Sequence, residues 1–336
     1  MTAHRAVPLA VTMGDPGGVG PEITAHAWQA MRRNGPAFFV IADPHLFNQP
    51  NIETKIIDDG QSAAGVFADA LPILPLENRV AASLGQTDTA NAPAILESIE
   101  RAVAFATQHG GGVVTNPIQK STLMSAGFTF PGHTEFLADL TKNTPMRNGL
   151  TRGPIMMLAG PTLKSVPVTV HASVKDAIGC LTATMIEHCA HVVAQSLKYD
   201  FGIDEPRIAI SGLNPHAGEG GALGMEDEMI IAPAIENLAA AGYNVVGPKP
   251  ADGMFHSSAR AAYDVAICML HDQALIPVKT LAFDETVNVT LGLPVVRTSP
   301  DHGTALDIAG KDIARADSLI ASINLAADIT TRRQVK

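Results

Sequence analysis

The stretch Leu270–Gly310 reads LHDQALIPVKTLAFDETVNVTLGLPVVRTSPDHGTALDIAG, and its apolar residues are typical of strands buried in a sheet. It also carries many ionisable and amide side chains, namely His271, Asp272, Lys279, Asn288, Arg297, Asp301 and His302. Burying charge is costly unless the charge is paired, bound to a ligand or used in chemistry. The stretch is therefore the first candidate for a functional site.

Outward from this stretch, short β-branched runs alternate with longer helical patterns along the chain. The predicted strands are Pro8–Met13, Ala37–Ala42, Gly112–Thr115, Ile155–Ala159, Ser165–Val170, Arg207–Ser211, Asn244–Val246, Asp264–Leu270 and Pro294–Thr298. The predicted helices are Glu22–Arg33, Thr89–Gln108, Glu135–Leu140, Val174–Leu197, Asp227–Ala240 and Ala314–Ala327. Strands separated by helices of this length indicate βαβ units, so the predicted fold class is α/β with mainly parallel sheets.

Length and composition narrow the class of protein. A chain of 336 residues exceeds the roughly 250–300 at which a single core stops growing, so two domains are expected. The net charge of −10 without a basic tract argues against a nucleic-acid partner. No apolar run approaches the roughly 18–20 residues of a membrane span. Cys180, Cys189 and Cys268 form no CxxC pair, so reduced, buried cysteines in a cytoplasmic protein are expected.

Three histidines follow predicted strands. His171 comes directly after SVPVTV, His271 directly after DVAICML, and His216 lies in the loop SGLNPHAGEGG after RIAIS. Parallel α/β sheets bind ligands beyond the carboxyl ends of their strands. Three imidazoles placed there could converge on one metal ion and leave positions for water or substrate. Alternatively, each is a loop histidine with a local hydrogen bond, and the spacing leaves both interpretations open.

Other loops have both ligand-binding and structural interpretations. The glycine-rich loop Met13–Glu22 matches neither GxGxxG nor GxxxxGK[ST], so it is as compatible with a tight turn as with a ligand loop. Thr134, after His133, could cap a short helix, or the free N–H groups there could bind phosphate or carboxylate. Thr115–Pro117 ends a strand and Lys120 follows, which is compatible with the edge of a cleft.

Within the opening stretch, Lys279, Asn288 and Arg297 form a candidate anion-binding set. Arginine offers a planar fork, lysine a point charge and asparagine a neutral donor, a mixture that suits phosphate or carboxylate. The segment Asp301–Thr304 follows the last strand and is expected to open another helix, again a position for a ligand.

The chain resembles the 4-hydroxythreonine-4-phosphate dehydrogenase family through motifs that keep their order along nearly the whole sequence. They are VTMGDPGGVGPEI, VTNPIQK, PGHTEFL, SGLNPHAGEGG, GPKPADGMFH, LHDQALIPVK and VNVTLGLPVVRTSPDHGTALDIAG. DHGTALDIAG is also similar to the cofactor loop of isocitrate and isopropylmalate dehydrogenases. The resemblance implies their fold, two α/β/α domains with an active site in the interdomain cleft. With the breaks in the pattern near 128–131 and 283–288, it predicts a discontinuous domain, 1–130 plus 285–336, carrying the cofactor loop. The second domain, 131–284, would carry the metal ligands and the dimer interface.

The resemblance also assigns residues, position by position. It implies a divalent ion (Zn, Co, Mg or Mn) on His171, His216 and His271. It implies substrate contacts from His133, Thr134, Lys279, Asn288 and Arg297. It implies NAD or NADP contacts from His302, Gly303, Thr304 and Ala305. Asp272 and Lys279 are candidate catalytic residues, with no general base assigned. The family is homodimeric with active sites at the subunit interface, so ligands from both chains are expected.

The reaction implied is NAD(P)-dependent oxidation of 4-phosphooxy-L-threonine to 2-amino-3-oxo-4-phosphooxybutanoate. This product decarboxylates to 3-amino-2-oxopropyl phosphate, a step toward pyridoxal 5'-phosphate. The metal would acidify the C3 hydroxyl and stabilise the enolate as carbon dioxide leaves. GDPGG, HASVKD and Met269–His271 depart from the family's usual GDPAG, HIPLRD-like and Met-Tyr-His sequences, so sister dehydrogenases of threonate or erythronate 4-phosphate, or of an aromatic cis-dihydrodiol, are alternatives. A phosphate acyltransferase and a metal-binding protein without catalysis are more remote ones.

Overall fold

The structure is a computed structural model that describes residues 7–335. These residues form two compact units. Unit 1 comprises the described chain up to Pro145 and from Leu293 onward, and unit 2 is Met146–Gly292.

The boundaries of the units lie further along the chain than the sequence predicted, at 145 and 292 rather than at 130 and 284. At the first boundary, helix α5 (His133–Leu140) stays in unit 1. Its Phe136 ring packs against Phe128, with the ring centroids 5.1 Å apart. At the second, strand β11 (Val287–Leu291) stays in unit 2 because it pairs with β6 (Ile155–Ala159).

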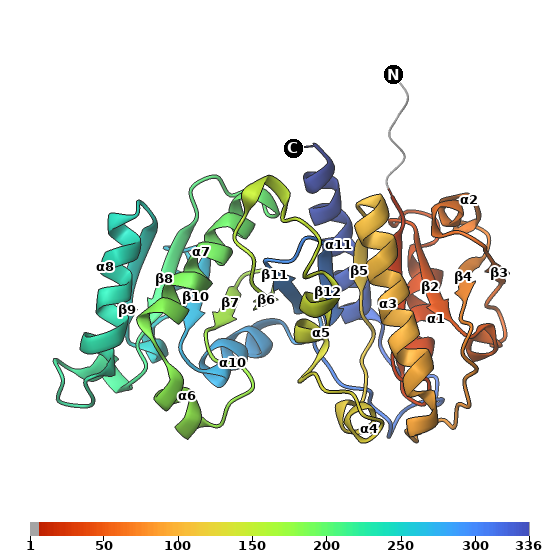
Figure 1. Ribbon diagram of the computed structural model, residues 1–336, viewed down its shortest axis with the longest axis horizontal. Coiled ribbons are helices and arrows are strands. Elements are labelled where there is room, and N and C mark those ends of the chain that lie inside the picture. The colour runs from red at the N-terminus through yellow and green to blue at the C-terminus, as the bar shows by residue number, and fades with distance from the viewer. Residues whose placement is uncertain (1–6, 336) are drawn as a thin grey trace. The chain divides into compact units, whose positions relative to one another are not determined.

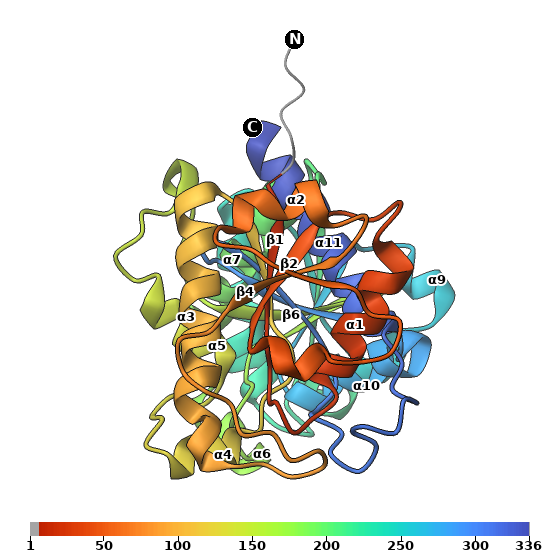
Figure 2. The ribbon, with the colours of Figure 1, turned by 90° about the vertical axis from the view of Figure 1, so that its right-hand side faces the viewer.

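Unit 1 is built on a sheet whose order is β3-β4-β2-β1-β5-β12, with every pairing parallel. The strands are β1 (Leu9–Thr12), β2 (Phe38–Ala42), β3 (Thr54–Ile56), β4 (Leu71–Pro75), β5 (Gly112–Val114) and β12 (Val296–Pro300). Helix α3 covers one face, and α1 and α11 cover the other (Figure 2). The larger helices are α1 (Gly20–Met31), α3 (Ala92–His109) and α11 (Asp317–Val335). Residues of β1 and β2 are buried throughout, as expected for strands covered on both faces.

Unit 2 has a mixed sheet in the order β11-β6-β7-β10-β8-β9 (Figure 1). Strand β6 is antiparallel to both neighbours, and β7, β10, β8 and β9 are parallel to one another. The strands not yet bounded are β7 (Lys164–Pro167), β8 (Arg207–Ser211), β9 (Asn244–Lys249) and β10 (Val265–Cys268). The helices are α6 (Val174–Cys180), α7 (Ala183–Tyr199), α8 (Ala232–Ala240), α9 (Ser257–Arg260) and α10 (His271–Ala282). The predicted α/β class with mainly parallel pairing is confirmed.

Several predicted elements need correction. His271–Ala282 is a helix rather than sheet, because Ala274, Leu275 and Val278 are buried at helical spacing. The predicted helix Val174–Leu197 is broken into α6 and α7, where Thr182 accepts the Met185 N–H at 3.3 Å and caps the second helix.

Two predicted helix starts are also wrong. The residue preceding α5 is Gly132 rather than Thr134, which lies inside the helix. The chain after Asp301 remains irregular until α11 begins at Asp317. Strands β3, β4 and β11 were not predicted.

The cysteines are unpaired, but they differ in exposure. Cys189 and Cys268 are buried, and burial raises the pKa of each thiol to about 12. Cys180, at the end of α6, is exposed, which corrects the expectation that all three are buried. Within residues 7–335 no single helix combines the length and apolarity of a membrane span, although the bent pair α6 and α7 does so when its two parts are added, with 93° between them.

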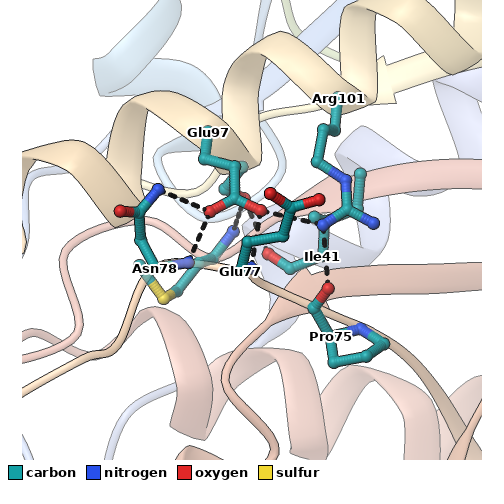
Figure 3. Close-up of polar contacts among 8 residues, drawn as sticks. Ile41, Pro75, Glu77, Asn78, Glu97 and Arg101 are labelled. Atoms are coloured by element: carbon teal, nitrogen blue, oxygen red, sulfur yellow. Dashed lines mark hydrogen bonds and ion pairs between the residues drawn. The ribbon is translucent and has the colours of Figure 1, made fainter.

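The chain after β4 is fastened to α3 by Glu97 and Arg101 (Figure 3). The Glu97 carboxylate accepts the backbone N–H groups of Glu77 at 2.8 Å and Asn78 at 2.9 Å. Arg101 donates to Glu97 and to the carbonyl of Pro75, both at 2.8 Å. Burial alone would raise the pKa of Glu97, but these hydrogen bonds outweigh it and lower the pKa. The charged carboxylate therefore fixes the path of this loop.

Candidate functional site

The three predicted metal histidines follow neighbouring strands of unit 2. His171 follows β7, His271 follows β10 as the first residue of α10, and His216 lies in the turn Pro215–Gly218 after β8. Strand β10 lies between β7 and β8, and both pairings are parallel. The carboxyl ends of these strands therefore meet at one edge of the sheet, where α/β proteins bind ligands.

The three imidazoles do not form a closed metal site within one chain. In the described part of the chain, Glu22, His26 and Asp312 of unit 1 are the only set of three whose ligand atoms all lie within 4.8 Å of one another. That set could hold a metal ion by distance. However, Glu22 accepts the N–H groups of Gly310 and Ala314 at 3.2 and 2.9 Å. The His26 ring contacts Asp312 at 3.0 Å. Glu22 and His26 of α1 therefore already bind the segment after the predicted cofactor loop through hydrogen bonds. Asp312 of that segment is 286 residues away from His26 in sequence.

His271 is oriented by its neighbour. Its Nδ1 lies 2.7 Å from Oδ1 of Asp272, whose side chain is exposed. A carboxylate only accepts hydrogen bonds, so Nδ1 carries a proton and Nε2 is the nitrogen left to bind a metal ion. A metal-binding histidine is usually held in this way, with the nitrogen that does not bind the metal donating to a carboxylate.

His216 lies in a strained turn. Its φ of 53° and the φ of 51° at Ala217 are in the left-handed region, which costs a non-glycine residue on the order of 1–3 kcal/mol. Gly218, Gly220 and Gly221 continue the turn with positive φ. The imidazole is exposed at the surface of unit 2. Strain of this kind persists only where the surrounding structure holds it.

A separate group of side chains in unit 1 places the cations Arg297 and Lys120 near His133. Arg297 is 4% exposed and donates through Nη2 and Nε to Oγ1 of Thr115, at 2.8 and 3.2 Å. Burial lowers the pKa of Arg297 to about 10, against the opposing charges of Asp301 and Glu135. An arginine with this pKa stays charged at neutral pH. The site therefore keeps a buried guanidinium near the start of β12.

The imidazole of His133 lies beside this guanidinium. Its Nε2 is buried and has no hydrogen-bond partner among residues 7–335. Burial, and then the charges of Arg297 and Lys120, hold the pKa of His133 well below its ordinary value. A neutral imidazole, a guanidinium and an ammonium together provide the donors that a phosphate or carboxylate needs. Lys120 was not among the predicted substrate contacts, and its position after Thr115–Pro117 was the only sequence signal for it.

We expect His133 to make the stability of the protein depend on pH. The pKa of His133 in the folded protein lies below the 6.5 of the free imidazole, so the unfolded chain takes up a proton there at a higher pH than the folded protein does. The free energy of unfolding is therefore highest above pH 6.5 and decreases as pH falls toward the folded-state pKa. The Tm of the wild type should therefore fall more steeply between about pH 7 and 5 than that of His133→Gln, measured by calorimetry. His45→Gln, at an exposed histidine of the same unit, should keep the wild-type slope. Equal slopes for wild type and His133→Gln would contradict the buried neutral imidazole.

The remaining predicted substrate residues are divided between the units. Lys279 and Asn288 belong to unit 2, whereas Thr134 and Arg297 belong to unit 1. The Lys279 ammonium lies 5.8 Å from the centroid of the exposed Phe283 ring. Asn288 lies on β11, opposite Leu158 of β6.

The predicted cofactor loop packs on the glycine-rich loop of unit 1. The Thr304 carbonyl accepts the Val19 N–H at 3.0 Å. A Cβ on Gly18 would come 2.8 Å from that carbonyl, so only glycine allows this approach. The Thr304 hydroxyl donates to Oε1 of Gln119 at 3.3 Å, and His302 Nδ1 contacts its neighbour's carbonyl. Gly18 therefore allows the close packing between these two loops.

A cavity of about 650 Å³ in unit 1 adjoins the glycine-rich loop and the segment after the predicted cofactor loop. Its wall includes Gly18 of the glycine-rich loop, Gly310 and Asp312 of the following segment, and His26 of α1. The volume lies within the roughly 300–1,000 Å³ of small-molecule sites.

Comparison with known proteins gives a consistent set of relatives. Residues 35–326 match the family described as pyridoxal phosphate biosynthetic protein PdxA. A 4-hydroxythreonine-4-phosphate dehydrogenase from Caulobacter vibrioides is 52% identical over 98% of this chain and 99% of its own length. The crystal structure of a protein of that name from Klebsiella pneumoniae is 34% identical with a TM-score of 0.82, covering 98% of this chain and 99% of that one. A terephthalate 1,2-cis-dihydrodiol dehydrogenase from Burkholderia xenovorans is 26% identical with a TM-score of 0.63, covering 96% and 98%.

Proposed function

We propose that this chain, which belongs to the family of the pyridoxal phosphate biosynthetic protein PdxA, is a 4-hydroxythreonine-4-phosphate dehydrogenase. The reaction is NAD(P)-dependent oxidation of 4-phosphooxy-L-threonine to 2-amino-3-oxo-4-phosphooxybutanoate, which loses carbon dioxide to give 3-amino-2-oxopropyl phosphate. The observation that carries the proposal is the placement of three imidazoles after the neighbouring parallel strands β7, β10 and β8. The cationic group around a buried arginine in unit 1 supports an anionic substrate.

Each unit offers side chains whose chemistry suits the anionic groups of the substrate. In unit 1, Arg297 offers a fork of donors, His133 a neutral imidazole, and Thr134 a hydroxyl at the start of α5. In unit 2, Lys279 offers an ammonium and Asn288 an uncharged donor. Arg297, held by Thr115, binds an oxyanion without first having to be ordered.

His171, His216 and His271 would hold one divalent ion. Imidazole nitrogens suit Zn²⁺ and Co²⁺, and added water or substrate oxygens would also suit Mg²⁺ or Mn²⁺. The fit rests on the orientation of His271 by Asp272 and on the shared sheet edge. When bound, the ion supplies Lewis-acid stabilisation of negative charge during oxidation and decarboxylation. Asp272 and Lys279 are the proposed proton-transfer residues, and both lie on α10, where Lys279 is about two turns beyond His271.

The ion is proposed to be shared between two subunits of a homodimer. The spacing of the three histidines within one chain supports sharing, since they do not form a compact set. Exposed apolar side chains on unit 2 support a protein interface, because burying apolar surface is favourable. They include Val174, Ile178, Leu223, Met225, Met229 and Val246.

The dinucleotide is proposed to contact His302, Gly303, Thr304 and Ala305. The packing of this loop on the glycine-rich loop and the neighbouring cavity support this placement. The nicotinamide supplies the hydride acceptor.

One assay panel tests the function. NAD(P) reduction should be fastest with 4-phosphooxy-L-threonine and slower with threonate 4-phosphate, erythronate 4-phosphate and a terephthalate cis-dihydrodiol. A higher kcat/KM for one of the latter would replace the proposed substrate with that one. Acyl transfer to coenzyme A without any dinucleotide reduction would instead identify a phosphate acyltransferase.

A further inference from the structure

The side chain of Gln273 connects the turn before His271 with the chain that leads to His216. Gln273 lies in the first turn of α10, where its Oε1 accepts the Leu270 N–H at 3.0 Å. Its Nε2 donates to the Gly212 carbonyl at 3.1 Å and makes a longer contact, 3.5 Å, with the Leu213 carbonyl. One amide therefore joins the ends of β10 and β8.

The same segment is held from its other side by a buried carboxylate. Asp227 is 1% exposed and accepts the N–H groups of Leu213 at 2.9 Å and Asn214 at 3.1 Å. It also accepts the side-chain amide of Asn214 at 3.0 Å. A Cβ on Gly212 would come 2.6 Å from Asp227 Oδ1, so the segment has little room to shift. The carbonyls bound by Gln273 and the N–H groups bound by Asp227 lie two to four residues before His216.

We propose that Gln273 is a positioning residue that sets the spacing between the His216 loop and the His271 turn. The inference rests on the proposed function, since both histidines are proposed metal ligands. The argument is geometric. The amide fixes the backbone immediately before His271 and the backbone that enters the strained turn of His216. Without the Nε2 donor of Gln273, the Gly212 and Leu213 carbonyls would lose this hydrogen-bond partner. The segments that carry His216 and His271 could then move apart.

Simple helix capping does not account for this arrangement. A residue that caps its own helix through the Leu270 N–H needs only an acceptor, and glutamate serves equally well at this position. The Nε2 group of Gln273 instead reaches carbonyls on another strand, 60 and 61 residues away in sequence. This donor half distinguishes a link between two segments from a local cap.

The experiment compares Gln273→Met and Gln273→Glu with the wild-type full-length protein. Methionine keeps the length of the side chain and removes both hydrogen bonds, whereas glutamate keeps only the acceptor. Zn²⁺ affinity is measured by competition with a chromogenic chelator, and Tm is measured on metal-free protein. We expect both variants to bind Zn²⁺ about 10- to 100-fold more weakly, as is typical when the partners of metal ligands are removed. The added negative charge of glutamate favours cation binding, so a loss in that variant is the more stringent result.

Gln195→Met is the matched control. Gln195 lies on α7 in the same unit, and its Oε1 accepts the Thr151 N–H at 2.7 Å, so the variant also loses an amide hydrogen bond. It should bind Zn²⁺ as the wild type does. The inference is overturned if Gln273→Glu keeps its Zn²⁺ affinity within about threefold of wild type, whatever the result for Gln273→Met. If Gln273→Met fails to fold, the glutamate variant decides. Failure of His271→Ala to weaken Zn²⁺ binding would instead refute the metal site of the proposed function.

Discussion

His216→Ala is expected to abolish NAD(P) reduction with 4-phosphooxy-L-threonine, and added Zn²⁺ or Mg²⁺ should not restore it. A catalytic metal supplies several kcal/mol of charge stabilisation, which at about 1.4 kcal/mol per tenfold corresponds to a loss of roughly a thousandfold or more in kcat. The variant should still fold, because the imidazole is exposed and the strain of the positive φ at this position is already present with histidine. Steady-state kinetics and Zn²⁺ affinity measure the loss of the metal site, and the Tm of metal-free protein shows whether the variant is still folded.

His191→Ala is the control for this prediction. His191 lies on α7 with its ring 4.9 Å from that of Tyr243, away from the ends of the strands that carry the proposed ligands. It should retain wild-type activity and Zn²⁺ affinity. Full activity in His216→Ala would end the metal assignment, whereas a fall in both activity and Tm would point to a structural role for the turn.

The placement of the histidines was predictable because it depends on topology. Each of His171, His216 and His271 follows a β-branched run, and runs alternating with helices predict parallel strands. Parallel strands end on the same edge of a sheet, so the shared edge follows without any knowledge of side-chain contacts. The same argument could not set the distances between the rings. It left open whether one chain can enclose a metal ion.

Contacts between distant segments left no comparable pattern in the sequence. Lys120 influences His133 although nothing in the local sequence links them. Gln273 reaches Gly212 across 61 residues, and its ordinary helical position gives no sign of a second role. The helix that contains Gln273 was itself mistaken for sheet, because a short apolar run fits both periods. Long-range hydrogen bonds of single side chains become visible only in three dimensions.

Arg297→Met is expected to lower kcat/KM by about 30- to 4,000-fold, the equivalent of the roughly 2–5 kcal/mol lost when one partner of a buried, hydrogen-bonded charge pair is removed. The guanidinium is almost fully buried, and its geometry is already set by Thr115. Its loss would leave the nearby carboxyl groups of Asp301 and Glu135 without the charge that opposes them. The substitution should therefore weaken anion binding in two ways. It removes the donors that bind the anion, and it leaves two carboxyl groups whose negative charge repels the anion.

A second measurement separates substrate binding from folding in the Arg297 variants. Inorganic phosphate should raise the Tm of the wild type, because a ligand that binds only the folded state stabilises it. That rise should disappear in Arg297→Met. Arg297→Lys keeps the charge but loses the planar fork, so it should give an intermediate kcat/KM and a smaller rise in Tm. If phosphate raises the Tm of Arg297→Met as much as that of the wild type, the anion binds elsewhere. The assignment of Arg297 to the substrate would then be wrong, even if the variant were less active.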